Sequence, residues 1–153
     1  MLAITTSHRT RGIGVNPSDL IGDEMFVFAD CIMLSSLKIV RYTTVGQHLV
    51  LGDELLIDET DLTELMPHFS VDVGSSRYIG GEAAAHGSGG FFYKTTGQVL
   101  DWALMSEDSN PFVSVAVQGD SVRFLSSLGY TWVVPGDDIT RVFIDTERAA
   151  SFQ

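Results

Sequence analysis

The sequence predicts an α+β fold, a mostly antiparallel sheet with a few short helices, in a single domain spanning residues 1–153. Short apolar runs recur along the chain with glycine-containing turns between them, which is typical of antiparallel strands. Other segments begin with helix-capping residues. Hydrophobic residues make up 44% of the chain and charged residues 19%, and no linker or repeat divides it, so one packed core is expected.

The first elements are a helical turn and an apolar segment. Residues 16–22 carry Asn16, Pro17 and Gly22 at the positions that a cap, a first helical residue and a helix end prefer. Residues 25–34 are apolar apart from Asp30, and their periodicity fits a buried strand or a short helix; we favour the strand. This segment is about half the length that a membrane span needs, so no membrane crossing is expected.

A meander of three strands follows, then a short helix. Residues 37–42, 48–51 and 55–57 are apolar runs separated by glycine-containing turns. Residues 58–66 open with capping and acidic residues, as helix N-termini prefer, and stop at Pro67, which predicts a short helix.

The middle of the chain predicts a hairpin beside a glycine-rich loop. Residues 77–79 are expected as a strand flanked by flexible loop, because glycines crowd the segment 74–90. Residues 91–95 and 98–104 are aromatic and β-branched runs on either side of Gly97, which is typical of two paired strands.

The last third predicts a strand, a helix and two terminal strands. Residues 112–117 alternate weakly and indicate a strand. Residues 120–129 place Val122, Leu125 and Leu128 at helical spacing before a terminal glycine, so a helix is expected. Terminal strands are expected at 130–134 and 141–144, and residues 147–153 are expected to fray.

The chain is strongly acidic. Nine Lys and Arg against 20 Asp and Glu give a formal charge of −11, which repels phosphate backbones, so nucleic acid is not an expected ligand. The acids concentrate in one stretch without Lys or Arg: Asp53, Glu54, Asp58, Glu59, Asp61 and Glu64. Such a stretch is either a binding surface for a basic protein or an ordinary solvated face, and the sequence leaves both open.

Catalytic and metal signatures are missing. The four histidines have no paired spacing with each other or with Cys31, so neither a metal nor a cofactor is expected. Ser88 lies between glycines, but His86 stands where a hydrolase nucleophile turn needs glycine, so loop flexibility explains the glycines better and an enzyme is not expected. The alternative is a small hydrolase that uses the Gly80–Gly90 loop, with His86 as base and Ser88 or Glu82 as its partner.

The single cysteine points to a cellular compartment. Cys31 lies in the apolar segment, where an inert buried thiol is expected, and it cannot form an internal disulfide. Because no secretory leader pattern is visible at the N-terminus, a reducing cytoplasmic location is expected.

The order of four motifs resembles the SUKH superfamily: residues 90–93, the glycine turn and strand at 97–102, the segment 117–128 with its serine and Phe-Leu pair, and the early element 12–17. This resemblance implies a SUKH-like α+β fold and, for many members, a bacterial immunity protein. Such a protein would bind a basic toxin domain, often a nuclease, and block its active surface. A structural or assembly subunit, phage-derived or self-associating, is the alternative. The toxin and the oligomeric state stay open.

Overall fold

The fold is almost entirely β-strand. A computed structural model describes residues 24–26, 31–36, 38–56, 62–83 and 87–147. Within these residues the chain forms strands and a single-turn 3-10 helix, η4, but no α-helix, so the predicted α+β class, SUKH-like fold included, is wrong. The elements are β1 (Glu24–Phe26), β2 (Cys31–Ser35), β3 (Lys38–Val45), β4 (His48–Glu54), β5 (Leu62–Val73), β6 (Ser76–Ala83), β7 (Gly90–Thr96), β8 (Val99–Ser106), β9 (Phe112–Gln118), β10 (Ser121–Ser126), β11 (Thr131–Pro135), η4 (Ile139–Arg141) and β12 (Phe143–Asp145).

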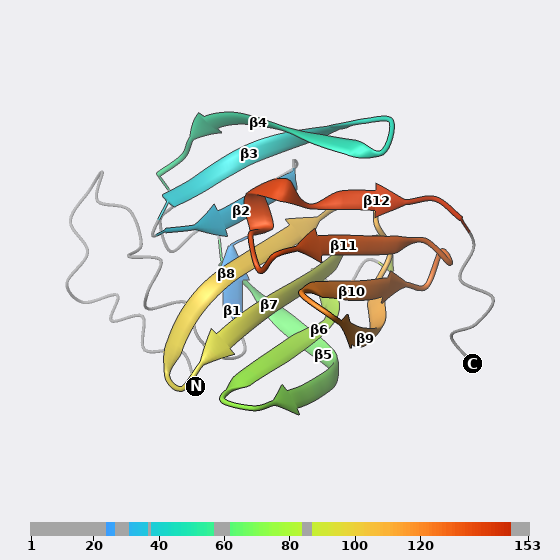
Figure 1. The fold of residues 1–153 in the computed structure, drawn as a ribbon. Helices are drawn as coiled ribbons and strands as arrows, with labels where there is room; N and C mark the ends of the chain where they lie inside the picture. Colours follow the sequence, from blue (N-terminus) through green and yellow to red (C-terminus); the bar gives the residue numbers. More distant parts are fainter. Residues whose placement is uncertain (1–23, 27–30, 37, 57–61, 84–86, 148–153) are drawn as a thin grey trace.

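All these strands belong to one antiparallel sheet in the order β1-β5-β6-β7-β8-β2-β3-β4-β12-β11-β10-β9. The sheet rolls up so that β9, at one end of the order, contacts β5, β6 and β7 near the other end. Figure 1 shows β10 to β12 in front of β7 and β8, with the β3–β4 hairpin above them. The result is a nearly closed sheet with an interior.

Aromatic side chains fill the interior. Phe92 on β7 stacks on Phe124 of β10 with ring centroids 3.9 Å apart, and Trp102 and Phe112 meet the same rings edge-on. Trp132 of β11 packs against Phe112 at 5.7 Å. Large buried rings supply much of the stabilisation of a small domain because each removes a large apolar area from water.

The central strands β2, β7 and β8 are buried on both faces over much of their length, which explains their mainly apolar sequences. Ile32, Phe91 and Ala103 belong to a second cluster of buried residues, distinct from the one around Phe92 and Phe124. A strand with two buried faces cannot show the alternation that identifies a half-exposed strand.

Most predicted strands are confirmed. The hairpin around Gly97 is β7–β8, in which Tyr93 pairs with Ala103. The strand around residues 77–79 is β6, that at 112–117 is β9, and the terminal strands are β11 and β12. The first two strands of the meander are β3 and β4, but Leu55 and Leu56 after β4 are not strand, and Ile57 lies outside the described residues.

The segment 25–34 is strand where the chain is described, but it contains the ends of two strands, Met25–Phe26 of β1 and Cys31–Leu34 of β2, which pair with different neighbours, and not the single strand expected. Residues 27–30 lie outside the described residues, as do the helical turn expected at 16–22 and all but Glu147 of the segment expected to fray.

Both testable helix predictions are wrong. Residues 62–66 of the expected helix 58–66 begin β5, which pairs with β6 and passes Pro67 through an irregularity in the register; residues 58–61 lie outside the described residues. The expected helix 120–129 is β10 and the turn after it. Between β9 and β11, the strand buries Val122, Phe124 and Ser126 on alternate positions, a period of two.

Among the described residues, no helix is long and apolar enough to span a membrane.

Candidate functional site

Strand β4 is a sheet edge over most of its length. On one side it pairs with β3 from Val45↔His48 to Val40↔Glu54. On the other side its only pair within the described chain is Phe143↔His48 of β12, beside which the Ile144 N–H donates to the Gln47 carbonyl at 2.8 Å. Figure 1 shows β12 meeting the β3–β4 hairpin at its turn. From Leu49 to Glu54 this side of the strand has no pairing strand in the described structure.

The edge stays open because the chain before β12 turns into the core. Residues 139–141 form η4, whose cap residue Asp138 accepts a hydrogen bond from the Thr140 N–H at 3.0 Å. Ile139 and Val142 are buried in the aromatic interior. The backbone that would otherwise continue β12 along β4 is therefore committed to another conformation.

A bulge in β4 creates a hollow beside this edge. Because the pairing shifts between Tyr42↔Leu51 and Val40↔Glu54, Gly52 and Asp53 both stand opposite Arg41. A Cβ atom at Gly52 would lie 3.1 Å from the Arg41 carbonyl oxygen, so glycine permits the close approach. The hollow measures about 260 Å³, enough for a side chain but smaller than most small-molecule sites. Its lining is Arg41, Tyr42, Thr43, Val50, Leu51, Gly52, Asp53 and Leu55.

The edge combines exposed apolar side chains with carboxylates. Val50 is 51% exposed and Leu51 is 42% exposed, and both are followed along the strand by the exposed Asp53 and Glu54. Glu54 lies 3.9 Å from the Lys38 ammonium, but both side chains are more than half exposed, so this pair is weak and leaves the carboxylate available. The chemistry suits an extended chain with apolar and basic side chains.

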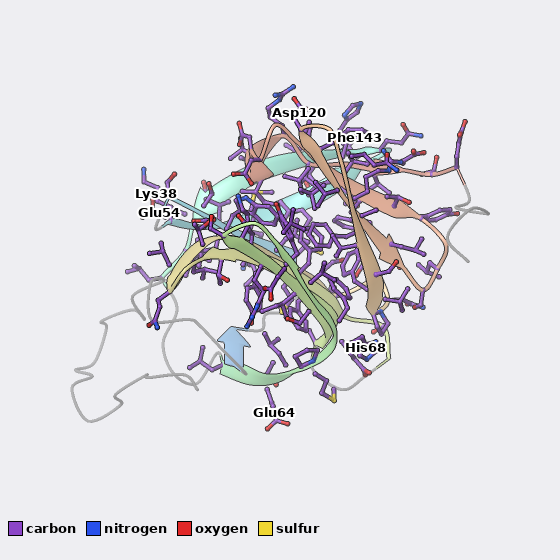
Figure 2. All side chains as sticks on the ribbon, turned by 60° about the horizontal axis from the view of Figure 1, so that its bottom comes forward. Lys38, Glu54, Glu64, His68, Asp120 and Phe143 are labelled. Carbon is purple, nitrogen blue, oxygen red and sulfur yellow. The ribbon has the colours of Figure 1, made fainter. Side chains whose placement is uncertain are left out.

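The predicted acidic stretch is divided. Asp53 and Glu54 end β4, whereas Glu64 is on β5 and pairs in register with Glu24 of β1. Figure 2 places Glu54 beside Lys38 and Glu64 in a separate part of the molecule. Asp58, Glu59 and Asp61 lie outside the described residues.

A second polar cluster surrounds the nearly buried Lys94 of β7. Its ammonium lies 2.7 Å from Asp137 and 3.7 Å from Asp101, and the Trp102 indole N–H donates to Asp137 at 3.1 Å. Burial lowers the pKa of Lys94, but the hydrogen bond and charge of Asp137 outweigh it and the net shift is upward. Lys94 is therefore charged, and its ion pair with Asp137 holds the turn before η4. It is not a neutral amine available as nucleophile or base.

Cys31 is only partly buried, which corrects the buried thiol expected there, but its surroundings favour the neutral thiol. Its sulfur lies 3.7 Å from the Ser106 hydroxyl, and burial raises the pKa of the thiol despite hydrogen bonds that lower it. A thiol with a raised pKa reacts slowly because the thiolate is the nucleophile.

The described part of the Gly80–Gly90 segment does not test the hydrolase alternative. The Glu82 carboxylate accepts a hydrogen bond from the Gly87 N–H at 3.0 Å, and Ser88 is exposed. His86 lies outside the described residues. Gly80 and Gly81 belong to β6 and Gly90 to β7, where added side chains would strike neighbouring atoms. These glycines allow close strand packing, which corrects the flexible loop expected for them.

No trio of His, Cys, Asp or Glu in the described parts of the chain is arranged to hold a metal ion. The sequence identified Asp53 and Glu54 but missed the hollow, because the bulge follows from the pairing of β3 with β4. The glycine before Asp53 was the available signal. No known protein family, characterised protein or solved structure matches this chain.

Proposed function

We propose that this chain is a binding protein that takes an extended, basic segment of a partner protein as an additional strand on the open edge of β4. The observation that carries the proposal is the one-sided pairing of Leu49–Glu54. Open backbone donors and acceptors give affinity in strand addition, and pockets for alternate side chains give specificity. The hollow beside Asp53 supplies such a pocket.

Charge supports a basic partner. The formal charge of −11 accelerates encounter with a positively charged protein, and Asp53 and Glu54 lie at the end of the edge itself. The same charge opposes pairing between two copies of this chain, because each copy repels the other.

Neutralisation of a basic toxin domain is the biological form of this proposal. Its support is the sign of the charge and the motif order that resembles SUKH immunity proteins, but not the fold, since the implied α+β architecture is wrong for this chain. Blocking a toxin requires binding and no chemistry. A cytoplasmic location belongs to the same proposal.

The test compares two charge-matched double variants in pull-downs from the native cells. Asp53→Lys with Glu54→Lys reverses the charge at the edge, and Asp120→Lys with Glu147→Lys makes the same change in net charge at other exposed positions. We expect wild type and the second variant to capture a basic protein that the first does not. Equal capture by all three would exclude the β4 edge.

Hydrogen exchange then locates the contact. In the captured complex, amide exchange in residues 49–54 should slow, because strand addition pairs backbone groups that are open in the free protein. Protection confined to another strand would refute strand addition on β4 even if the capture pattern agreed.

A further inference from the structure

We infer that the segment docked on β4 runs antiparallel to it, in line with β12, with its basic residues at its N-terminal end beside Asp53 and Glu54. This inference rests on the proposed function, since it specifies the polarity and sequence of the segment that β4 binds.

The position follows from the register of β12. Phe143 pairs with His48, and in an antiparallel ladder each step backward along β12 is a step forward along β4. A strand continuing β12 backward would therefore lie along Leu49–Glu54. The protein's own chain leaves this line at Val142, the residue that caps η4.

The chain before β12 is held away from that line at several points. Ile139 is 1% exposed and Val142 is 4% exposed. Asp137, just before η4, has a left-handed φ of 60° and is held by the Lys94 ammonium and the Trp102 indole. Extending this segment along β4 would expose both apolar side chains and break both polar contacts, so a partner segment is the better occupant.

Polarity follows from pairing and charge together. Antiparallel pairing is slightly more stable per residue than parallel pairing, and here it continues the direction of β12. In that orientation the N-terminal end of the segment lies by Asp53 and Glu54, and its C-terminal end approaches η4, which ends in the exposed Arg141. At the first end, the exposed Lys38–Glu54 pair is weak and leaves the carboxylates available. At the second end, Asp137 is paired with Lys94 and Asp138 caps η4, whereas Arg141 is exposed. Basic residues are therefore favoured at the first end and disfavoured at the second.

The experiment uses a synthetic hexapeptide amide of sequence Arg-Lys-Val-Thr-Val-Thr, with a nitroxide spin label at either its N-terminal or its C-terminal end. Binding to the isotopically labelled protein is read from amide shifts along β4, and orientation from the amides that each label broadens. We expect the N-terminal label to broaden Asp53 and Glu54, and the C-terminal label to broaden His48 and Val142.

The reversed peptide, Thr-Val-Thr-Val-Lys-Arg, is the matched control. With the same composition but its basic residues directed to η4, it should bind about three- to tenfold more weakly, since one or two exposed ion pairs are lost. Shifts on β4 with the opposite broadening pattern, or equal affinity of the two peptides, would overturn the inferred polarity and leave strand addition standing. Absence of β4 shifts with both peptides at millimolar concentration would overturn the inference together with the proposed function.

Discussion

The Lys94 side chain joins two parts of the chain that are 43 positions apart, since its ammonium pairs with Asp137 at 2.7 Å and is only 10% exposed. Substituting Lys94→Met keeps the aliphatic stem but removes the charge, leaving Asp137 and Asp101 to be rehydrated. We expect the free energy of unfolding to fall by about 1–3 kcal/mol, measured by urea denaturation. Arg77→Met is the control, because the Arg77–Asp72 pair is well exposed and should contribute much less. Equal losses in the two variants would mean that burial does not determine how much each ion pair contributes to the free energy of unfolding.

Tyr42 gives a prediction about alkaline pH. Burial raises the pKa of its hydroxyl well above the ordinary value, and the hydroxyl donates to the Met105 carbonyl at 3.0 Å. The unfolded chain releases this proton first, so the stabilisation is complete below the unfolded pKa of about 10 and is lost as pH rises above it. We expect the urea concentration at the midpoint of unfolding to decrease as the pH rises from about 9.5 to about 11, and to decrease less steeply in Tyr42→Phe. Parallel pH profiles for the two proteins would contradict this assignment.

Packing of β5 on β6 depends on a glycine. A Cβ atom at Gly81 would lie 2.6 Å from the His68 backbone nitrogen and 2.9 Å from Pro67 Cα, and backbone atoms of a paired strand cannot move aside as a flexible side chain would. Gly81→Ala should therefore destabilise the protein by about 2–3 kcal/mol, read from thermal unfolding. In the same hairpin, Gly74 has a φ of 62° and open space around it, so Gly74→Asn should change stability little, since asparagine tolerates that conformation. A stable Gly81→Ala protein would show that the strands can separate locally.

Most strands of the sheet could be predicted from the sequence, but the start of β5 and the whole of β10 were predicted as helices. Val122, Leu125 and Leu128 fit a helical period, yet Val122 and Phe124 are buried while Leu128 is 38% exposed. The sequence of this segment fits both a helical period and the period of two of a strand. It forms a strand because β9 and β11 pair with it from either side. Helix-capping residues before Leu62 were likewise outweighed by the partner strand β6. Tertiary pairing overrides local preference in both cases.

Only the charged residues of the candidate site could be predicted from the sequence. Asp53 and Glu54 stand out in the sequence, but their place at an open edge depends on η4 diverting the chain before β12. The Lys94–Asp137 ion pair has no local spacing that would identify it. Sites assembled from distant strands become visible only when the order of the strands is known.

At the scale of the whole molecule, electrostatic repulsion between copies opposes their association through the open edge of β4. At neutral pH the charge of −11 keeps copies apart. This repulsion weakens as carboxylates become protonated at about pH 4–5, in their ordinary pKa range. We expect light scattering at that pH to show association, and less of it in Val50→Thr, which replaces an exposed methyl group on β4 with a hydroxyl without altering charge. Val99→Thr, a change of the same kind on β8, serves as the control. Identical association of all three proteins would place the contact elsewhere.

The position of β2 between β3 and β8 has a consequence for synthesis on the ribosome. Residues 31–54 can form β2, β3 and β4 as soon as they emerge, but the strand that covers the other side of β2 ends at Ser106. At roughly 5–20 residues per second, the ribosome takes several seconds to deliver it. During that interval Ile32, Met33 and Leu34, all buried in the finished protein, lie on an unpaired edge of a nascent chain. We expect the growing polypeptide to be prone to association through this edge during that interval.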